Sequence, residues 1–211
     1  MKKIDEGVIK YKQGRFLETD AIPQNEWERL NYSRELLYSK GLIGEYDQPK
    51  VGYGNVSLKM DYSSFAPPSG PQFLITGTQT GGLEHLNGEH YTRVLSFDVA
   101  SMTLDAMGPI KASSEAITHG AIYLSSSTVV AVFHIHHDTI WKKMIEDGYP
   151  STSPDVEYGS LDMAREVQSL VSSGTTSFVT RGHEDGIFIF GDCLESIEKE
   201  TLEIYDRFNG A

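Results

Sequence analysis

The sequence of 211 residues predicts an α/β fold in which helices pack on an antiparallel or mixed sheet. Short apolar stretches typical of buried strands are interleaved along the chain with segments of helical periodicity. Their order is not the strict strand–helix–strand repeat that indicates a fully parallel sheet. Near the C-terminus, two strand-like stretches flank residues 181–186, and the Asp-Gly pair that ends this segment is typical of a β-hairpin.

One helix is predicted in the N-terminal half, at residues 25–40. Trp27, Leu30 and Leu37 share one of its faces, and Gly41 lies just beyond its end, as is common at helix C-termini. Strands are expected in the three apolar segments that follow: within 49–60, after a glycine-rich turn, at 73–76 and at 94–97.

The C-terminal half alternates between helices and strands. Residues 160–172 carry the clearest helical stripe and end before Gly174, while Asp192 and Glu195 form a capping pair that starts the last helix. Two further helices are expected at 115–124 and 138–147. Three strands are expected at 128–136, 177–180 and 187–190, the last two as a hairpin.

Composition and charge indicate a cytoplasmic, single-domain protein. With 39% hydrophobic residues, 1–211 form one domain that includes a mixed lead-in segment at 1–24. The net charge of −12 and the lack of a basic cluster argue against nucleic acid and anionic lipid as partners. No apolar run reaches the length of a membrane span, and the start lacks the hydrophobic stretch of a signal peptide. Cys193 is the single cysteine, which fits a reducing cytoplasm.

The most informative motif is a histidine cluster at the end of the strand predicted at 128–136. Because side chains alternate across a strand, His134 and His136 lie on one face and His137 falls on the other. Structural histidines are the alternative, but burying two imidazoles without a strong partner is costly. The pair therefore predicts half of a metal site.

His183, in the turn of the predicted hairpin, is the best candidate for a third imidazole ligand. Taken alone, it is better explained as a polar turn residue. It becomes a stronger candidate together with His134 and His136, because catalytic zinc typically uses three protein ligands and keeps one position open. His85, His90 and His119 lie in polar or turn-like contexts and are weaker candidates.

Two further groups of residues could bind an anion. Ser113 and Ser114 precede the helix predicted from Glu115 onward, where the three residues serve in part as an ordinary N-cap with an acidic first turn. Two hydroxyls at a helix start also bind phosphate, and a carboxylate beside a divalent metal can ligate it or act as a general base. Gly54 and Asn55 form a turn that can place backbone amides around an anion.

These motifs resemble, in their order and spacing, those of the class II aldolase/adducin family. The resemblance covers residues 26–208 and rests on five motifs: Gly54-Asn55-Val56-Ser57, Leu74-Ile75-Thr76 with its following loop, Ser113-Ser114-Glu115, His134-x-His136 and Gly182-His183. It implies a three-layer α/β/α sandwich around a mostly antiparallel central sheet. It also implies a homotetramer of fourfold symmetry with sites between the subunits.

The resemblance also implies roles for single residues. Zinc or a similar divalent ion would bind His134, His136 and His183, and Glu115 matches the family's acidic, proton-shuttling residue. The positions that match the phosphate-binding residues are Gly54, Asn55, Ser113 and Ser114. The implied activity is that of a zinc-dependent aldehyde-lyase of carbohydrate metabolism, which cleaves a small phosphorylated ketose through a metal-stabilised enediolate.

The chain departs from the family pattern in the substrate region. The loop at 77–82 lacks the family's Thr-Pro-(Ser/Thr)-Gly sequence, and it lacks the lysine of a P-loop, which excludes a nucleotide triphosphatase. Tyr149 and Tyr158 are candidates for a catalytic tyrosine of the kind found between the second and third ligands of relatives. The alternatives are an epimerase or dehydratase that uses the same metal site, or a non-catalytic, adducin-like assembly domain.

Overall fold

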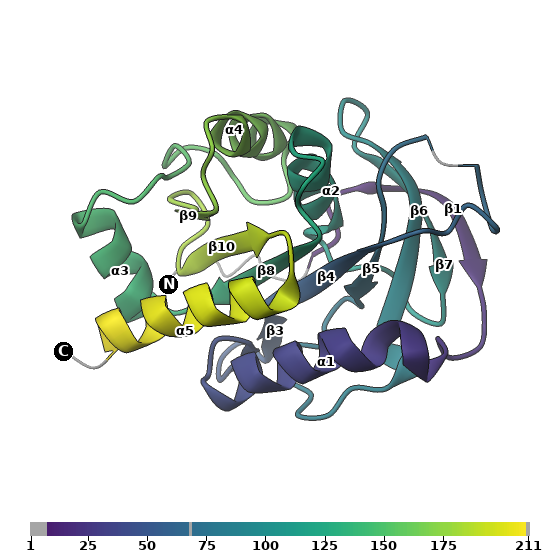
Figure 1. The fold of residues 1–211 in the computed structure, drawn as a ribbon, viewed down its shortest axis with the longest axis horizontal. Coiled ribbons are helices and arrows are strands. Elements are labelled where there is room, and N and C mark those ends of the chain that lie inside the picture. The colour runs from purple at the N-terminus through teal and green to yellow at the C-terminus, as the bar shows by residue number, and fades with distance from the viewer. Residues whose placement is uncertain (1–7, 68, 210–211) are drawn as a thin grey trace.

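The computed structural model describes residues 8–67 and 69–209. The start of the lead-in segment at 1–7, Pro68 and the last two residues of the expected domain therefore lie outside the described residues. Within them, an eight-stranded sheet carries helices on both faces (Figure 1). The predicted α/β fold is confirmed.

The described elements comprise the eight strands of the large sheet, a two-stranded hairpin, five α-helices and one 3₁₀ turn. The strands of the large sheet are β1 (Lys12–Glu18), β4 (Asn55–Met60), β5 (Gln72–Thr76), β6 (Tyr91–Asp98), β7 (Thr103–Gly108), β8 (Ala131–His136), β9 (Ser177–Val179) and β10 (Gly186–Gly191). A separate hairpin consists of β2 (Gly44–Tyr46) and β3 (Val51–Tyr53). The helices are α1 (Gln24–Ser39), α2 (Ala116–Ser125), α3 (Asp138–Glu146), α4 (Leu161–Ser172) and α5 (Leu194–Asn209), with a 3₁₀ turn, η1 (Gly88–His90).

The large sheet is mixed, which corrects the expectation of a mostly antiparallel sheet. Its strand order is β1-β7-β6-β5-β4-β8-β10-β9, and β1 pairs with β7 in parallel. The other neighbouring pairs of the described sheet are antiparallel. The difference arises in the lead-in segment at 1–24, which contains a strand where none was expected. A parallel pair needs a long connection, so no local turn signal identifies β1 as a partner of β7.

Helices α1 and α5 cover one face of the sheet, and α2 and α4 cover the other (Figure 1). Because side chains alternate along β8, Ala131, Phe133 and Ile135 join the apolar cluster beneath α1 and α5. Val132 belongs to the opposite cluster, beneath α2 and α4. His134 and His136 have the same alternation as Val132, so the strand directs them toward the layer that contains α2.

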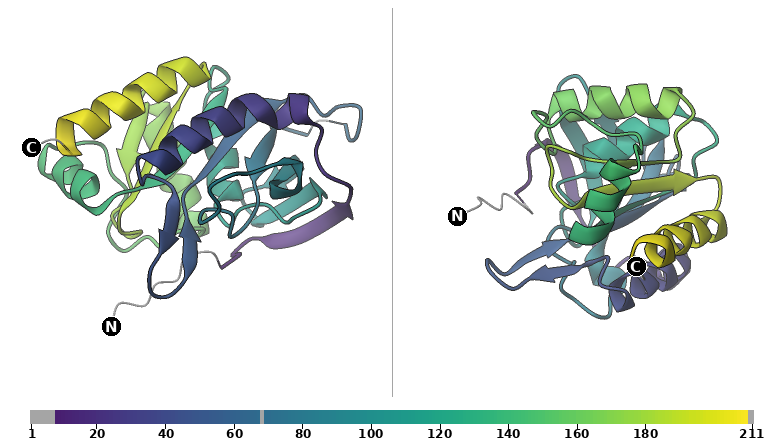
Figure 2. Two further views of the ribbon diagram at one scale, coloured as in Figure 1. Left: turned by 90° about the horizontal axis from the view of Figure 1, so that it is seen from below. Right: turned by 90° about the vertical axis from the view of Figure 1, so that its left-hand side faces the viewer.

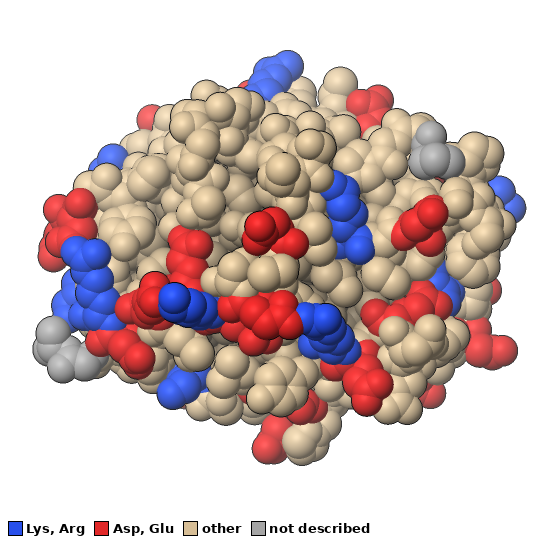
Figure 3. Space-filling view, in the orientation of Figure 1, with Lys and Arg blue, Asp and Glu red and all other residues tan. Residues whose placement is uncertain are grey.

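The last helix begins at Leu194, two residues later than expected, and its start differs from the predicted capping pair. Asp192 accepts a hydrogen bond from the Ser196 hydroxyl, 3.2 Å away, and Glu195 pairs with Arg29 of α1. Acidic and basic side chains are interspersed over α5 and its surroundings (Figure 3), as on an ordinary solvated helix face. Among the residues described, none of the helices is long and apolar enough to cross a membrane.

Candidate metal centre and adjoining pocket

Three histidines from two segments of the chain converge at one end of the sheet. His134 and His136 end β8, and the antiparallel pairing of β8 with β10 places Gly186 opposite His136. This register brings the preceding turn, with His183, to the same end of the sheet. One nitrogen from each of the three imidazoles lies within 4.8 Å of the others, and all three side chains are buried.

The turn that carries His183 is held by a buried threonine. The Thr180 hydroxyl lies 2.8 Å from the carbonyl oxygen of His183 and 2.9 Å from that of Gly186. Asp185 adopts a φ of 68°, which the Asp-Gly turn accommodates. The ring of Tyr158 stacks on His183 with centroids 4.7 Å apart. The backbone and the ring contact together restrict where this imidazole can point.

The other two imidazoles are oriented through their Nδ1 atoms. His134 Nδ1 donates to the carbonyl oxygen of Ile187 at 3.3 Å, and its ring stacks on Phe188 at a centroid distance of 4.1 Å. His136 Nδ1 lies 3.0 Å from the hydroxyl of Tyr46. These contacts leave the two Nε2 atoms facing each other at 3.0 Å. Outer partners of this kind are what metal-binding histidines ordinarily have.

This donor set fits a divalent cation. Two nitrogen ligands of one tetrahedral zinc ion lie about 3.3 Å apart, since each bond is about 2.0–2.1 Å long. The separation of 3.0 Å between the facing Nε2 atoms is close to that value. Burial, followed by the neighbouring His136 and His183, holds the pKa of His134 well below its usual range. His134 is therefore neutral and can offer a lone pair.

The remaining histidines lie outside this cluster. His137 is the N-cap of α3, where its side chain accepts a hydrogen bond from Ile140 N at 3.4 Å. His85 is exposed beside Glu35, and His90 Nδ1 accepts a hydrogen bond from Asn87 N at 3.0 Å. Of the tyrosine candidates, Tyr158 stacks on His183 as described, whereas Tyr149 packs against Phe208.

Glu115 borders the three histidines without joining their closest group. It occupies the N-cap position of α2, and only 3% of its surface is exposed. Its Oε1 lies 3.8 Å from His183 Nδ1, which is beyond hydrogen-bond distance but close enough for electrostatic attraction. The start of α2 thus delivers a buried carboxylate to the edge of the histidine cluster.

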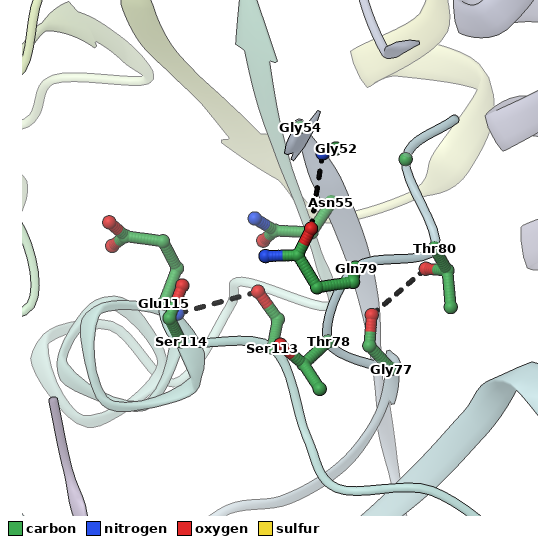
Figure 4. Close-up of a pocket in the computed structure, with 11 residues that line it drawn as sticks. Gly52, Gly54, Asn55, Gly77, Thr78, Gln79, Thr80, Ser113, Ser114 and Glu115 are labelled. Atoms are coloured by element: carbon green, nitrogen blue, oxygen red, sulfur yellow. Dashed lines mark hydrogen bonds between the residues drawn. The ribbon is translucent and has the colours of Figure 1, made fainter. Parts of the chain in front are cut away.

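A polar pocket adjoins this carboxylate. It is a small pocket of about 20 Å³, and its lining includes Gly54, Asn55, Ser113, Ser114 and Glu115. All four residues predicted to bind phosphate are therefore brought together with the predicted acid/base. Figure 4 shows Asn55 between the start of α2 and the loop after β5. Asn55 is also the residue of β4 that pairs with His134, so the pocket lies next to the histidine site.

Gly54 is required by its position in the wall of this pocket. Its φ is 77°, a left-handed conformation that side chains other than glycine rarely adopt. A Cβ atom there would lie 2.7 Å from Ile43 Cγ1 and 3.2 Å from the carbonyl oxygen of His134. The glycine thus lets the pocket wall run directly beside the strand that carries the histidines.

The loop after β5, which the sequence placed in the substrate region without roles for single residues, supplies part of the pocket lining. Thr78, Gln79 and Thr80 line the pocket, and Gln79 adopts a φ of 60°. The Gln79 side-chain oxygen accepts a hydrogen bond from Gly52 N at 3.2 Å (Figure 4). The departure from the family's loop sequence was the one signal that pointed to this segment. It indicated a changed loop, but not which side chains enter the pocket.

Arg34 of α1 holds this loop from behind. It is only 1% exposed, and it donates to the carbonyl oxygens of Glu84 at 2.7 Å, Gly81 at 2.9 Å and Thr80 at 3.3 Å. We expect Arg34→Met to lower the free energy of unfolding by about 2–4 kcal/mol, because buried carbonyls lose their donors. Urea denaturation would measure the loss.

Arg29→Met, on the same helix, is the matched control for Arg34→Met. Arg29 is 67% exposed and pairs with an exposed Glu195, so its loss should cost less than about 1 kcal/mol. Equal losses in the two variants would show that Arg34 does not anchor the loop.

His119 lies beneath the site, in the buried part of α2, which corrects its assignment to a polar or turn-like context. The side chain is 0% exposed, and its Nδ1 is 2.7 Å from the Ser57 hydroxyl, which in turn is 2.7 Å from the Tyr123 hydroxyl. Burial lowers the pKa of His119 to about 3. The imidazole is therefore neutral in the folded protein over the whole physiological range.

This shift makes stability depend on pH. Because the pKa is lower in the folded than in the unfolded chain, His119 favours unfolding as the pH falls from about 6.5 toward 3, by about 1.4 kcal/mol per pH unit. We expect His119→Gln to remove this slope when unfolding free energies are compared between pH 6 and 4. The control is His85→Gln, at a side chain that is 79% exposed. A wild-type slope in His119→Gln would contradict the prediction.

Comparison with known proteins identifies related sequences and folds. The model of the family described as class II aldolase and adducin N-terminal domain matches residues 34–196. The fold is similar to that of YgbL from Escherichia coli, with 18% identity, a TM-score of 0.63, and coverage of 87% of this chain and 86% of that one. No curated protein sequence matches the chain.

Two further solved structures share the fold. L-fuculose-1-phosphate aldolase from Thermus thermophilus is 20% identical, with a TM-score of 0.59 and coverage of 89% of each chain. The N-terminal class II aldolase domain of a Thermoplasma acidophilum protein is 16% identical, with a TM-score of 0.62 and coverage of 90% of this chain and 94% of that one. At these identities the likeness establishes the common fold.

Proposed function

Because the chain belongs to the class II aldolase and adducin family, we propose that it is a divalent-metal-dependent lyase that cleaves a small phosphorylated ketose. The observation that carries the proposal is the convergence of three buried imidazoles beside a buried carboxylate and a polar pocket. A bound cation would offset the cost of burying these groups together, since buried polar groups are stable only when they are hydrogen-bonded, paired or bound to a metal.

His134, His136 and His183 would hold the metal ion, and zinc suits three neutral imidazoles best. When bound, the ion supplies positive charge that stabilises the enediolate produced by carbon–carbon bond cleavage. Outer contacts from Ile187 and Tyr46 would keep two of the three rings in place.

Glu115 would move the proton. In aldol cleavage the substrate hydroxyl loses its proton to a base while the carbon–carbon bond breaks, and the bond's electron pair passes to the enediolate. The same group can then return a proton to the enediolate carbon. Glu115 is suited to this task because its carboxylate is buried and borders both His183 and the pocket.

The pocket would hold the anionic end of the substrate. Ser113 and Ser114 offer hydroxyls at the start of α2, and Gly54 and Asn55 offer a backbone turn and a side-chain amide opposite them. Local donors of this kind are needed because the chain carries a net charge of −12, which repels anions at long range.

A metal analysis joined to a substrate screen tests the proposal. We expect the purified protein to contain, or take up on titration, about one divalent ion per chain, and to cleave a phosphorylated ketose only when loaded. The screen should include free ketoses, which separates a need for phosphate from a need for the sugar. A protein that neither contains nor takes up a divalent metal would contradict the proposal.

Epimerisation or dehydration of a sugar phosphate is the alternative that the site favours next. Both reactions begin next to a carbonyl group, either with the loss of a proton from carbon or with the cleavage of a carbon–carbon bond. Glu115 beside a metal ion could move the proton in either case. Gln79, which lines the pocket in a loop that departs from the family sequence, favours a substrate other than those of the well-known relatives. Product masses decide, since cleavage shortens the carbon chain, dehydration removes water and epimerisation leaves the mass unchanged.

A homotetramer and a cytoplasmic location stay predictions. Light scattering would test the first, and the location of a tagged chain would test the second. A non-catalytic assembly domain is disfavoured because this chain keeps the three histidines and Glu115. If the chain were such an assembly domain, the wild type would show no turnover. Replacing all four residues would then leave its oligomeric state unchanged.

A further inference from the structure

We propose that Tyr46 is a positioning residue of the metal centre, whose hydroxyl keeps its hydrogen bond to His136 whichever ring nitrogen carries the hydrogen, and so lets His136 become a ligand. The inference rests on the proposed function, because it assigns to Tyr46 a part in preparing His136 as a ligand. Neither the histidine motif nor the polar pocket includes this residue. It lies in the small hairpin formed by β2 and β3, outside the large sheet.

The hairpin projects from the body of the molecule (Figure 2), and the chain just before it contacts the end of β8. His136 N donates to the carbonyl oxygen of Leu42 at 2.9 Å, just before β2 begins. Tyr46 packs against Tyr53 of β3, with ring centroids 4.6 Å apart, and places its hydroxyl 3.0 Å from His136 Nδ1. Backbone and side chain of one segment thus contact one histidine.

The two facing histidines differ in whether the hydrogen-bond partner of their Nδ1 atom can only accept or can also donate. His134 Nδ1 contacts a carbonyl oxygen, which only accepts, so its hydrogen stays on Nδ1 and Nε2 always presents a lone pair. His136 Nδ1 contacts a hydroxyl, which can donate or accept. Of the two, only His136 can change tautomer without losing its outer hydrogen bond.

This difference matters because the two Nε2 atoms are 3.0 Å apart. Without a metal ion, two facing lone pairs would repel, so His136 Nε2 carries a hydrogen and donates to His134, while Tyr46 donates to His136 Nδ1. To become a ligand, His136 must present a lone pair at Nε2 and carry its hydrogen on Nδ1. The Tyr46 hydroxyl then accepts that hydrogen, so no buried N–H loses its partner.

Tyr46→Phe tests the inference, and Tyr53→Phe is its matched control. Both rings contact His136, but the Tyr53 hydroxyl donates to the Gly41 carbonyl oxygen at 3.3 Å. Zn²⁺ affinity would be measured by competition with a chromophoric chelator, and Co²⁺ absorption would report the ligand geometry. The melting temperature of the metal-free protein would report folding.

We expect Tyr46→Phe to bind Zn²⁺ about 10- to 100-fold more weakly than wild type, with an altered Co²⁺ spectrum and little change in the metal-free melting temperature. Tyr53→Phe should bind Zn²⁺ as wild type does. Equal affinity of Tyr46→Phe and wild type would overturn the inference and leave the proposed function intact. Equal losses of affinity and stability in both variants would overturn it in favour of hairpin packing. A wild type that binds neither Zn²⁺, Co²⁺ nor any other divalent metal would overturn both proposals.

Discussion

Glu115→Gln is expected to lower turnover by about 100- to 10,000-fold while Zn²⁺ binding is retained. The amide keeps the size and polarity of the carboxylate but cannot accept the substrate's hydroxyl proton. Its position outside the closest histidine group, with 3.8 Å between Oε1 and His183 Nδ1, is the reason to expect that the metal stays bound. Incorporation of deuterium from solvent at the carbon of the product that the enediolate step protonates should fall in parallel with turnover.

Glu84→Gln is the control for Glu115→Gln, because Glu84 is 72% exposed and should leave turnover unchanged. Two outcomes would refute the assignment. If Glu115→Gln turns over substrate normally, another group moves the proton. If it loses Zn²⁺ instead, Glu115 acts as a ligand rather than as an acid/base.

His136→Ala is expected to abolish stable Zn²⁺ binding and to lower turnover by at least about 1,000-fold. Two imidazoles alone are too few ligands for a catalytic zinc site. The ion's stabilisation of the transition state, on the order of several kcal/mol, is lost together with the ion. Added Zn²⁺ should raise the melting temperature of the wild type, because it binds the folded state, and should have no such effect on the variant.

His137→Ala is a control one residue away from His136→Ala. His137 lies on the other face of the strand end, and its side chain caps α3. Its replacement should cost about 1 kcal/mol of stability, as the loss of a helix cap does, yet leave Zn²⁺ binding and turnover in place. If His137→Ala also loses Zn²⁺ binding and turnover, the assignment of His136 as a ligand and of His137 as a helix cap is wrong.

The sequence predicted those parts of the fold that depend on local pattern. The helices with clear apolar stripes were located to within a few residues, and the Asp-Gly turn identified the pair of β9 and β10. The alternation along β8 placed His134 and His136 on one face. The hairpin then explains why His183, 47 residues after His136 in the sequence, lies near both.

What the sequence did not reveal depends on contacts between distant segments. Strand β1 is largely exposed along its length, so it lacks a buried apolar pattern, and its parallel partner begins 91 residues later. His119 appeared polar in context, but the packing of α2 on the sheet buries it completely. Tyr46 reaches His136 only because a separate hairpin folds against the end of β8. Periodicity does not encode such contacts.

The hydrogen bonds from Arg34 to the loop after β5 separate two roles that loops usually combine, which are holding the loop's own backbone in place and lining the pocket. The arginine fixes the backbone of Thr80, Gly81 and Glu84 from the side of α1, whereas the side chains of Thr78 and Gln79 line the pocket. One end of the loop is therefore a fixed support, and the other is open to variation. Libraries that randomise Thr78 and Gln79 while keeping Arg34 should alter substrate choice without unfolding the loop, which makes this short segment a natural starting point for engineering.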